Sequence, residues 1–181
     1  MPDSALTERE RIIRIALDGC ANMRRRMYDH GFHGEWMHEP DRLTFQQAGL
    51  DCLIQRNEAT FTLNGYASVG PHHPFYDKKE LVMERVSCHG GVTWAGRCSG
   101  ILSREPLLVD EGIDEELYWI GFDCAHAWDL APGIEFGMTR ILPRPPGIDA
   151  VYRTFDYVKA EVEALAEFLT SAEVVGTEED D

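Results

Sequence analysis

Four side chains with acid–base or metal-binding chemistry follow directly after the most hydrophobic stretch of the chain. In YWIGFDCAHAWD, residues 118–129, the apolar residues lead into Asp123, Cys124, His126 and Asp129. A central strand carries its apolar residues through the core and delivers its polar end to the rim of the fold, where pockets form. Asp123 or Asp129 could orient His126, which would then act as a general base or bind a cation. The competing interpretation is that these groups only satisfy hydrogen bonds at the strand end.

A second candidate group is the HGG motif at 89–91. Its glycines would let backbone N–H groups approach a developing oxyanion, as in some esterases. The plainer interpretation is a glycine-rich turn that still leaves His89 in the site. Residues 96–100, GRCSG, fit a G-x-C-x-G nucleophile elbow. An elbow needs a helix after it, and Pro106 breaks the helix that would follow, so the spacing favours a bend over an elbow.

We expect His89, Asp123 and His126 to converge in one polar cluster, because both motifs lie at bends or ends of neighbouring predicted strands. Together with Asp129, these side chains would suit a catalytic divalent metal. The cysteines lack the C-x2-C pairs that hold structural zinc. The spacing leaves open whether any metal or cofactor is bound, and which one.

Cys124 is expected to be packed rather than nucleophilic. On an extended strand its side chain would stand about 6–7 Å from that of His126, which is too far for a direct hydrogen bond. The apolar run before Cys124 favours burial, and burial raises a thiol pKa. We therefore assign any chemistry to histidines and carboxylates.

Aromatic and histidine side chains from other segments would complete the site. Tyr66 lies in a strand-like segment, His73 in the proline-bounded loop that follows it, and Trp94 shortly after the HGG motif. With the candidate catalytic residues they would line a pocket for a nucleotide-like or other small polar ligand. If the protein turns this ligand over, hydrolysis through His126 and a carboxylate is the expected reaction class.

The hydrophobic periodicity predicts helices at both ends of the chain. The T-x-x-E spacing of Thr7 and Glu10 is typical of a capping box, and the apolar stripe after it predicts a helix from about Glu8 to Tyr28. A second amphipathic helix is expected after Thr154, its predicted N-cap. Residues 30–49 are interpreted as loop with one short helix.

Between the helices the period changes to two, which is typical of strands. Strands are predicted at 51–56, 60–69 and 117–126, and a strand bent at Gly90-Gly91 is predicted over 83–96. This pattern indicates an α+β fold with a central, mostly antiparallel sheet of short strands, flanked by an N-terminal and a C-terminal amphipathic helix, and with two or more helices covering one face. Residues 1–172 are expected to form a single domain, and 173–181 an acidic flexible tail.

The composition excludes several functional classes. The chain of 181 residues has a net charge of -15, of which the segment from Asp156 onward carries nine acids and one base. A generic nucleic-acid binder would have the opposite charge. Without a membrane-length apolar run or a signal peptide, and with five dispersed cysteines, a soluble cytoplasmic protein with reduced thiols is expected. The alternative to a ligand-binding pocket is an acidic inhibitor or adaptor that binds a host protein.

Four motifs in order resemble an uncharacterised family of small proteins common in phages, prophages and some bacterial genomes. They are LNGYASVGPHHPFYD, HGGVTWAG, GFDCAHAWD and YRTFDYVKAEVEALAEF, and they span roughly residues 50–169. The GPHHPFYD segment departs from the family pattern, which more usually has a glycine after the tyrosine. The resemblance implies a mobile-element context and a site built from His89, Asp123, His126 and Asp129, with Tyr66 and His73 nearby.

Overall fold

The computed structural model describes residues 7–97, 116–138 and 149–175. These residues form an α+β fold around a five-stranded antiparallel sheet with strand order β1-β2-β3-β5-β4. The strands are β1 Arg42–Gln47, β2 Leu50–Arg56, β3 Leu63–Val69, β4 Trp94–Arg97 and β5 Tyr118–Asp123. The helices are α1 Glu8–Asp29, α2 Lys79–Arg85, α3 Pro132–Met138 and α4 Phe155–Val175, with a short 3-10 helix η1 at Glu35–Met37. No helix among the described residues is long and apolar enough to cross a bilayer.

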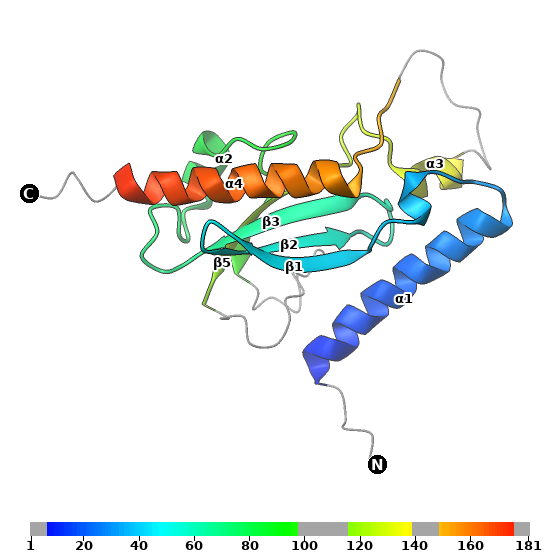
Figure 1. Ribbon diagram of the computed structural model, residues 1–181, viewed down its shortest axis with the longest axis horizontal. Helices are drawn as coiled ribbons and strands as arrows, with labels where there is room; N and C mark the ends of the chain where they lie inside the picture. Colours follow the sequence, from blue (N-terminus) through cyan, green and yellow to red (C-terminus); the bar gives the residue numbers. More distant parts are fainter. Residues whose placement is uncertain (1–6, 98–115, 139–148, 176–181) are drawn as a thin grey trace, which may run out of the picture.

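Helix α4 lies along one face of the sheet (Figure 1). Its buried apolar stripe includes Val158, Val162 and Leu169, and this stripe joins the main hydrophobic core with residues of β2, β3 and β5. Gly65 in β3 permits the close approach, because a Cβ there would lie 2.4 Å from Val162 and 2.6 Å from Phe122. The apolar period of the closing helix therefore predicted its packing face correctly.

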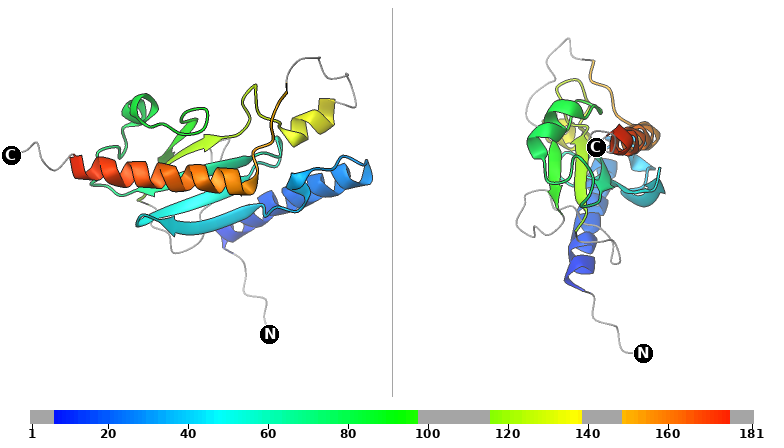
Figure 2. Two further views of the ribbon diagram at one scale, coloured as in Figure 1. Left: turned by 45° about the horizontal axis from the view of Figure 1, so that its top comes forward. Right: turned by 90° about the vertical axis from the view of Figure 1, so that its left-hand side faces the viewer.

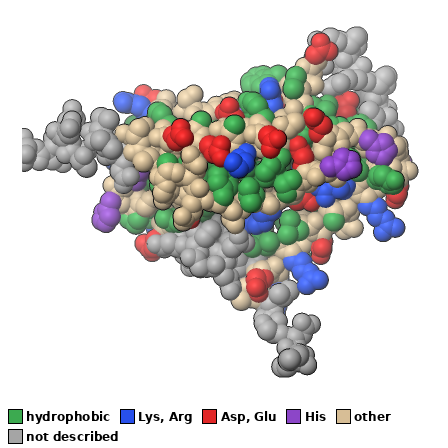
Figure 3. Space-filling view, viewed as in Figure 1, with side chains coloured by type: hydrophobic (Ala, Val, Ile, Leu, Met, Phe, Trp, Pro, Cys, Tyr) green, Lys and Arg blue, Asp and Glu red, His purple; other side chains and the backbone are tan. Residues whose placement is uncertain are grey.

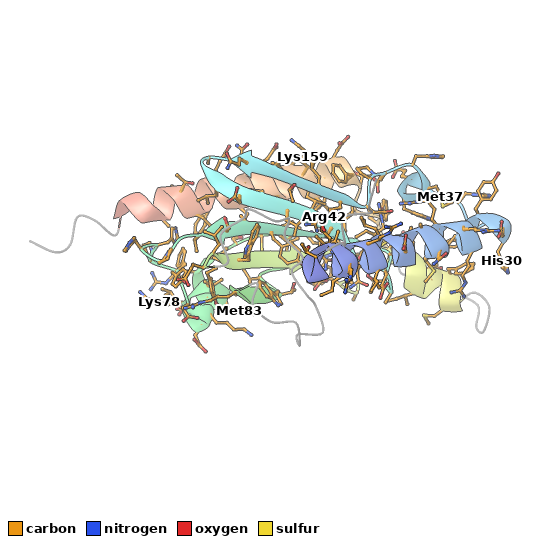
Figure 4. All side chains as sticks on the ribbon, turned by 90° about the horizontal axis from the view of Figure 1, so that it is seen from below. His30, Met37, Arg42, Lys78, Met83 and Lys159 are labelled. Atoms are coloured by element: carbon orange, nitrogen blue, oxygen red, sulfur yellow. The ribbon has the colours of Figure 1, made fainter. Side chains whose placement is uncertain are left out.

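Helix α1 lies on the opposite side of the sheet from α4, as the views in Figure 2 and Figure 4 show. Side chains of α1, including Leu17 and Cys20, share a crevice with Arg42 and Gln55 of the β1–β2 pair. The prediction that an N-terminal and a C-terminal helix flank the sheet is therefore confirmed. The apolar stripe of α1 buries Cys20 and Met27 in a hydrophobic cluster that also contains Trp36, Phe61 and Phe136. Next to this cluster, the helix meets the stems of long polar side chains.

The two central strands are buried on both faces, so their alternation separates two groups of side chains. Ile120 and Phe122 of β5 face α4 and belong to the main core. Trp119, which precedes Ile120 in β5, points to the opposite face. There it forms another buried cluster with Leu53 and Tyr66, and Trp94 packs against this cluster.

Two segments differ from the sequence prediction. Residues 83–88 were expected to be extended, but α2 ends at Arg85 and buries Val82 in the main core. Residues 30–49 contain the edge strand β1, which pairs with β2, in addition to the short helix η1. The sequence did not predict β1 because its residues show little alternation between buried and exposed positions. Helix α4 also continues to Val175, three residues into the segment assigned to the tail, and residues 176–181 lie outside the described residues.

A buried ion network ties the end of β2 to the start of α4. The guanidinium of Arg56, which has no exposed side-chain area, donates to Asp41 Oδ1 at 2.7 Å and to Glu39 Oε2 at 3.0 Å. It also donates to the hydroxyl of Tyr152 at 2.8 Å. The other carboxylate oxygen of Glu39 accepts from the backbone N–H of Phe155, the first residue of α4, at 2.8 Å. The network therefore fixes where α4 begins.

Candidate functional site

A single buried carboxylate organises the candidate site. Asp129 Oδ2 hydrogen-bonds with His89 Nε2 at 2.9 Å and with His126 Nδ1 at 3.1 Å. The other oxygen, Oδ1, accepts from Arg153 Nε at 2.8 Å. His89 Nδ1 pairs with the hydroxyl of Tyr157 at 2.9 Å. These five residues are referred to below as the Asp129 cluster.

Three separate segments bring the Asp129 cluster together at the end of β5. His126 and Asp129 lie in the turn after this strand, where Asp129 N–H donates to His126 O and the peptide N–H of His126 donates to Asp129 Oδ2. His89 comes from the turn after α2. Arg153 and Tyr157 flank the start of α4, where the Thr154 hydroxyl accepts from Tyr157 N–H as the predicted N-cap.

Gly90 allows the two imidazoles to approach each other. Its φ is +64°, a conformation that favours glycine, and a Cβ at this position would lie 2.1 Å from the ring of His126. The rings of His89 and His126 are consequently 5.3 Å apart between centroids. The N–H of Gly91 donates to Cys88 O within the same turn. The HGG motif therefore forms a tight turn that positions His89, with the Gly91 N–H already used.

Replacing Gly90 with alanine is expected to disrupt the site more than the same change at Gly91. Both residues have positive φ, but a Cβ on Gly91 meets no atom within 4 Å. The left-handed conformation costs about 1–2 kcal/mol in either variant, and only Gly90→Ala adds a clash with His126, worth about 1–3 kcal/mol more. Chemical denaturation of both variants measures the difference. Equal losses of unfolding free energy would contradict the packing role of Gly90.

The charges of the cluster balance in a water-poor environment. Burial acts to raise the pKa of Asp129, but hydrogen bonds from His89, Arg153 and His126 outweigh it and hold that pKa below its ordinary value. The hydrogen bond to Asp129 raises the pKa of Arg153. The site therefore keeps an ionised carboxylate beside a guanidinium. Burial and the charge of Glu161 raise the pKa of Tyr157, so its phenol stays protonated.

One side of the cluster is open to solvent. The Asp129 side chain is fully buried and that of His89 is 5% exposed, whereas 17% of His126 and 23% of Arg153 are exposed. Trp128 stacks on the His126 ring at 5.1 Å with an interplanar angle of 6°, and its side chain is largely exposed. A ligand would therefore meet His126, Trp128 and Arg153 first.

The structure brings together three of the four predicted catalytic residues. His89, His126 and Asp129 are in direct contact, while the carboxylate of Asp123 accepts from Ala125 N–H at 2.9 Å and shapes the turn after β5. Strand alternation turns Asp123 away from the α4 side on which His89 lies. Its structural role explains its position without a catalytic one.

The three predicted ligand-binding residues lie elsewhere. Tyr66 and Trp94 contact each other edge to face at 6.1 Å, on the sheet face opposite α4. His73 pairs with Leu169 O at 3.0 Å and accepts from Phe75 N–H at 3.1 Å. From Tyr157, Leu169 is about 18 Å along α4 at about 1.5 Å per residue, so His73 lies far from the Asp129 cluster.

Cys124 is 1% exposed, and burial followed by the charges of Asp129 and Asp123 raises its thiol pKa. Burial likewise raises the pKa of Cys20, Cys52 and Cys88 to about 12. The four described cysteines are free. Of the GRCSG motif, Gly96 and Arg97 end β4, and residues 98–100 lie outside the described residues.

Alkylation of Cys124 in the folded protein is expected to be slow at neutral pH, because the thiol is both buried and protonated. The measurement is the iodoacetamide labelling rate of each cysteine, read by peptide mass spectrometry. Half-buried Cys88 should react before Cys124. Rapid, selective labelling of Cys124 would contradict this prediction and restore a cysteine nucleophile.

Sequence reasoning missed Arg153, Tyr157 and Trp128 as members or neighbours of the site. Arg153 and Tyr157 lie 24 and 68 residues from their partners Asp129 and His89, so no local spacing connects them. Trp128 had a usable signal, because it lies between two candidate residues in a segment that leaves a strand.

Comparisons of the chain with protein-family models, curated proteins and solved structures gave no match.

Proposed function

We propose that the Asp129 cluster binds a small, polar, negatively charged ligand at its open side. The observation that carries this proposal is a fully buried carboxylate shared by two imidazoles and a guanidinium, of which one imidazole and the guanidinium reach solvent. Buried polar clusters that open at one side are typical of binding and catalytic sites.

The side chains around the opening indicate the class of ligand. The Arg153 guanidinium uses Nε for Asp129, which leaves its other N–H groups to face a phosphate or carboxylate. The exposed indole of Trp128 provides a flat surface on which a planar ring can stack. An anionic group joined to a planar ring is the chemistry of a nucleotide-like ligand. If the ligand is turned over, we propose hydrolysis, with water activated at the His126 edge.

A thermal-shift screen followed by calorimetry tests this proposal. The panel contains nucleoside mono- and diphosphates, sugar phosphates and small carboxylates. The best ligand should bind at least ten-fold more weakly to Arg153→Gln and Trp128→Ala. Arg97→Gln is the matched control, because Arg97 is an exposed arginine paired with Asp77 at the edge of the sheet. A panel without any binder, or equal affinity in all variants, would refute the proposal.

The acidic surface favours a second candidate function, an inhibitor or adaptor that binds a basic host protein. Three acidic residues, Asp156, Glu163 and Glu167, recur at helical spacing along α4, and Figure 3 shows acidic side chains along this face. Such a surface would attract a basic partner.

Reversing the charge at Asp156 and Glu167, which are both exposed, should then abolish co-purification of the basic host protein. Retained co-purification would exclude this face.

We also propose that the protein acts in a mobile-element context and in the cytoplasm. The resemblance to a phage and prophage family supports a mobile-element context. The free state of the four described cysteines is compatible with a reducing cytoplasm.

A further inference from the structure

We propose that His89 Nε2, His126 Nδ1 and Asp129 Oδ2 coordinate one divalent first-row transition-metal ion. This inference rests on the proposed function for its choice of site. It adds to that function the ion through which the anionic ligand would be held. Imidazole and carboxylate are the donor set of catalytic Zn²⁺ and of several related ions.

The spacing of the three donor atoms fits an ion. All three lie within 4.8 Å of one another, and the carboxylate oxygen is 2.9 Å and 3.1 Å from the two ring nitrogens. Ligands about 2.1 Å from a metal stand about 3.0 Å apart at right angles and about 3.4 Å apart in a tetrahedron. The carboxylate oxygen is therefore already at the separation of a neighbouring ligand from each ring nitrogen, and an ion could enter with small side-chain movements.

The outer contacts of the donors are those that metal ligands require. His89 uses its second ring nitrogen to pair with the Tyr157 hydroxyl, and Asp129 uses its second oxygen to accept from Arg153. Metal-bound histidines and carboxylates are generally oriented by such contacts. Tyr157 can serve both states, since its hydroxyl can donate to His89 Nδ1 without metal and accept from it with metal.

The ring of His126 is held in place by two contacts. Trp128 stacks on one face at 5.1 Å, and Gly90 lies so close to the ring that a Cβ would contact it at 2.1 Å. This contact fixes the ring plane while His126 Nδ1 faces Asp129 Oδ2. A histidine that only filled space at the surface would need no such restriction.

Three protein donors leave coordination positions vacant for water or ligand. One carboxylate charge does not neutralise a divalent ion, and Arg153 adds a further positive charge beside it. The metal-loaded site would therefore favour an anion, which agrees with the proposed ligand class, and would activate a bound water for hydrolysis.

Titration of the chelator-treated, dialysed full-length protein with Zn²⁺ tests the proposal, with Co²⁺ absorption as a spectroscopic probe. We expect one ion per chain. His89→Gln, His126→Gln and Asp129→Asn should each weaken Zn²⁺ binding at least 100-fold, and Tyr157→Phe should weaken it about 10–100-fold. His72→Gln is the control, because His72 is exposed in a loop remote from the cluster. Equal affinity in His89→Gln and the control, or a thiolate band in the Co²⁺ spectrum, would overturn the proposal.

A readout on the unmutated protein covers the case in which a variant fails to fold. Zn²⁺ bound at His89 Nε2 requires the proton of this ring on Nδ1, so the ¹⁵N shifts of His89 should report that tautomer after loading. Unchanged ¹⁵N shifts of His89 and His126 at saturating Zn²⁺ would refute coordination. Calorimetry of the nucleoside phosphates, sugar phosphates and small carboxylates of the screen, with and without Zn²⁺, separates the two proposals. If one of these compounds binds but Zn²⁺ does not, the proposed function stands and the metal site is rejected. If Zn²⁺ binds but none of the compounds does, the metal site stands and the proposed function is rejected.

Discussion

Replacing Arg56 with methionine is expected to lower the free energy of unfolding by about 3–5 kcal/mol, because it leaves the Glu39 carboxylate without its cation, while Asp41 keeps its ion pair with Arg24. The Arg56 side chain has no exposed area and contacts Glu39, Asp41 and Tyr152. Methionine keeps much of the volume, so the loss measures the charge and its hydrogen bonds rather than a cavity. Urea denaturation followed by circular dichroism gives the value.

Arg97→Met is the matched control for this experiment. Arg97 pairs with Asp77 at 3.1 Å, but both side chains are substantially exposed. Exposed ion pairs contribute about 0–1 kcal/mol because water screens them and side-chain entropy opposes them. Similar losses in the two variants would mean that the Arg56 network contributes no more than a surface pair.

The Arg56 network also concerns the candidate site. Glu39 holds the first turn of α4 through Phe155 N–H, and that turn carries Tyr157 beside His89. Loosening the network should therefore reduce Zn²⁺ and ligand affinity as well as stability. No residue of the network belongs to the Asp129 cluster, so the two effects can be separated by measuring affinity at a temperature where the variant is folded.

Local sequence patterns predicted the parts of the fold that depend on nearby residues. The capping box of Thr7 and Glu10 is present, with both reciprocal hydrogen bonds formed. The apolar stripe of α4 also corresponds to observed burial, and the alternation in β3 separates two sets of side chains that are both buried, on opposite faces of the sheet. Residues 83–88 were misread because their few apolar residues suit the end of a short buried helix as well as a strand.

Long-range contacts explain why the site was only partly predictable. His126 and Asp129 are three residues apart, and a polar turn after a strand places them together. Whether Tyr66 belongs to the site depends on the strand register. Tyr66 pairs with Gly121, and this pairing decides which face of the sheet its side chain occupies, which the sequence of one strand does not reveal. Arg153 joins the site only after the chain passes through α3 and returns beside Asp129, where Val151 forms a parallel bridge with it.

Replacing Asp129 with asparagine is expected to have the largest effect on the site itself. The carboxylate has hydrogen-bond partners on both oxygens, from His89, His126 and Arg153. An amide of the same size can accept on one side only, and its NH₂ group would face a donor on the other. The buried polar groups left unsatisfied should cost about 2–4 kcal/mol of unfolding free energy. Chemical denaturation of metal-free protein measures this loss.

Asp77→Asn is the control for this change, because Asp77 is an exposed carboxylate in a single ion pair and its loss should be nearly neutral. Zn²⁺ titration of folded Asp129→Asn then separates the two roles of the carboxylate. If Asp129 only organises hydrogen bonds, stability should fall while any Zn²⁺ binding by the two histidines persists with little change. If it is also a ligand, affinity should fall at least 100-fold, because the amide lacks the negative charge and the strong donor oxygen that the ion requires. Unchanged stability would contradict the organising role, since it would mean that the most buried charge of the cluster contributes nothing to holding its three segments together.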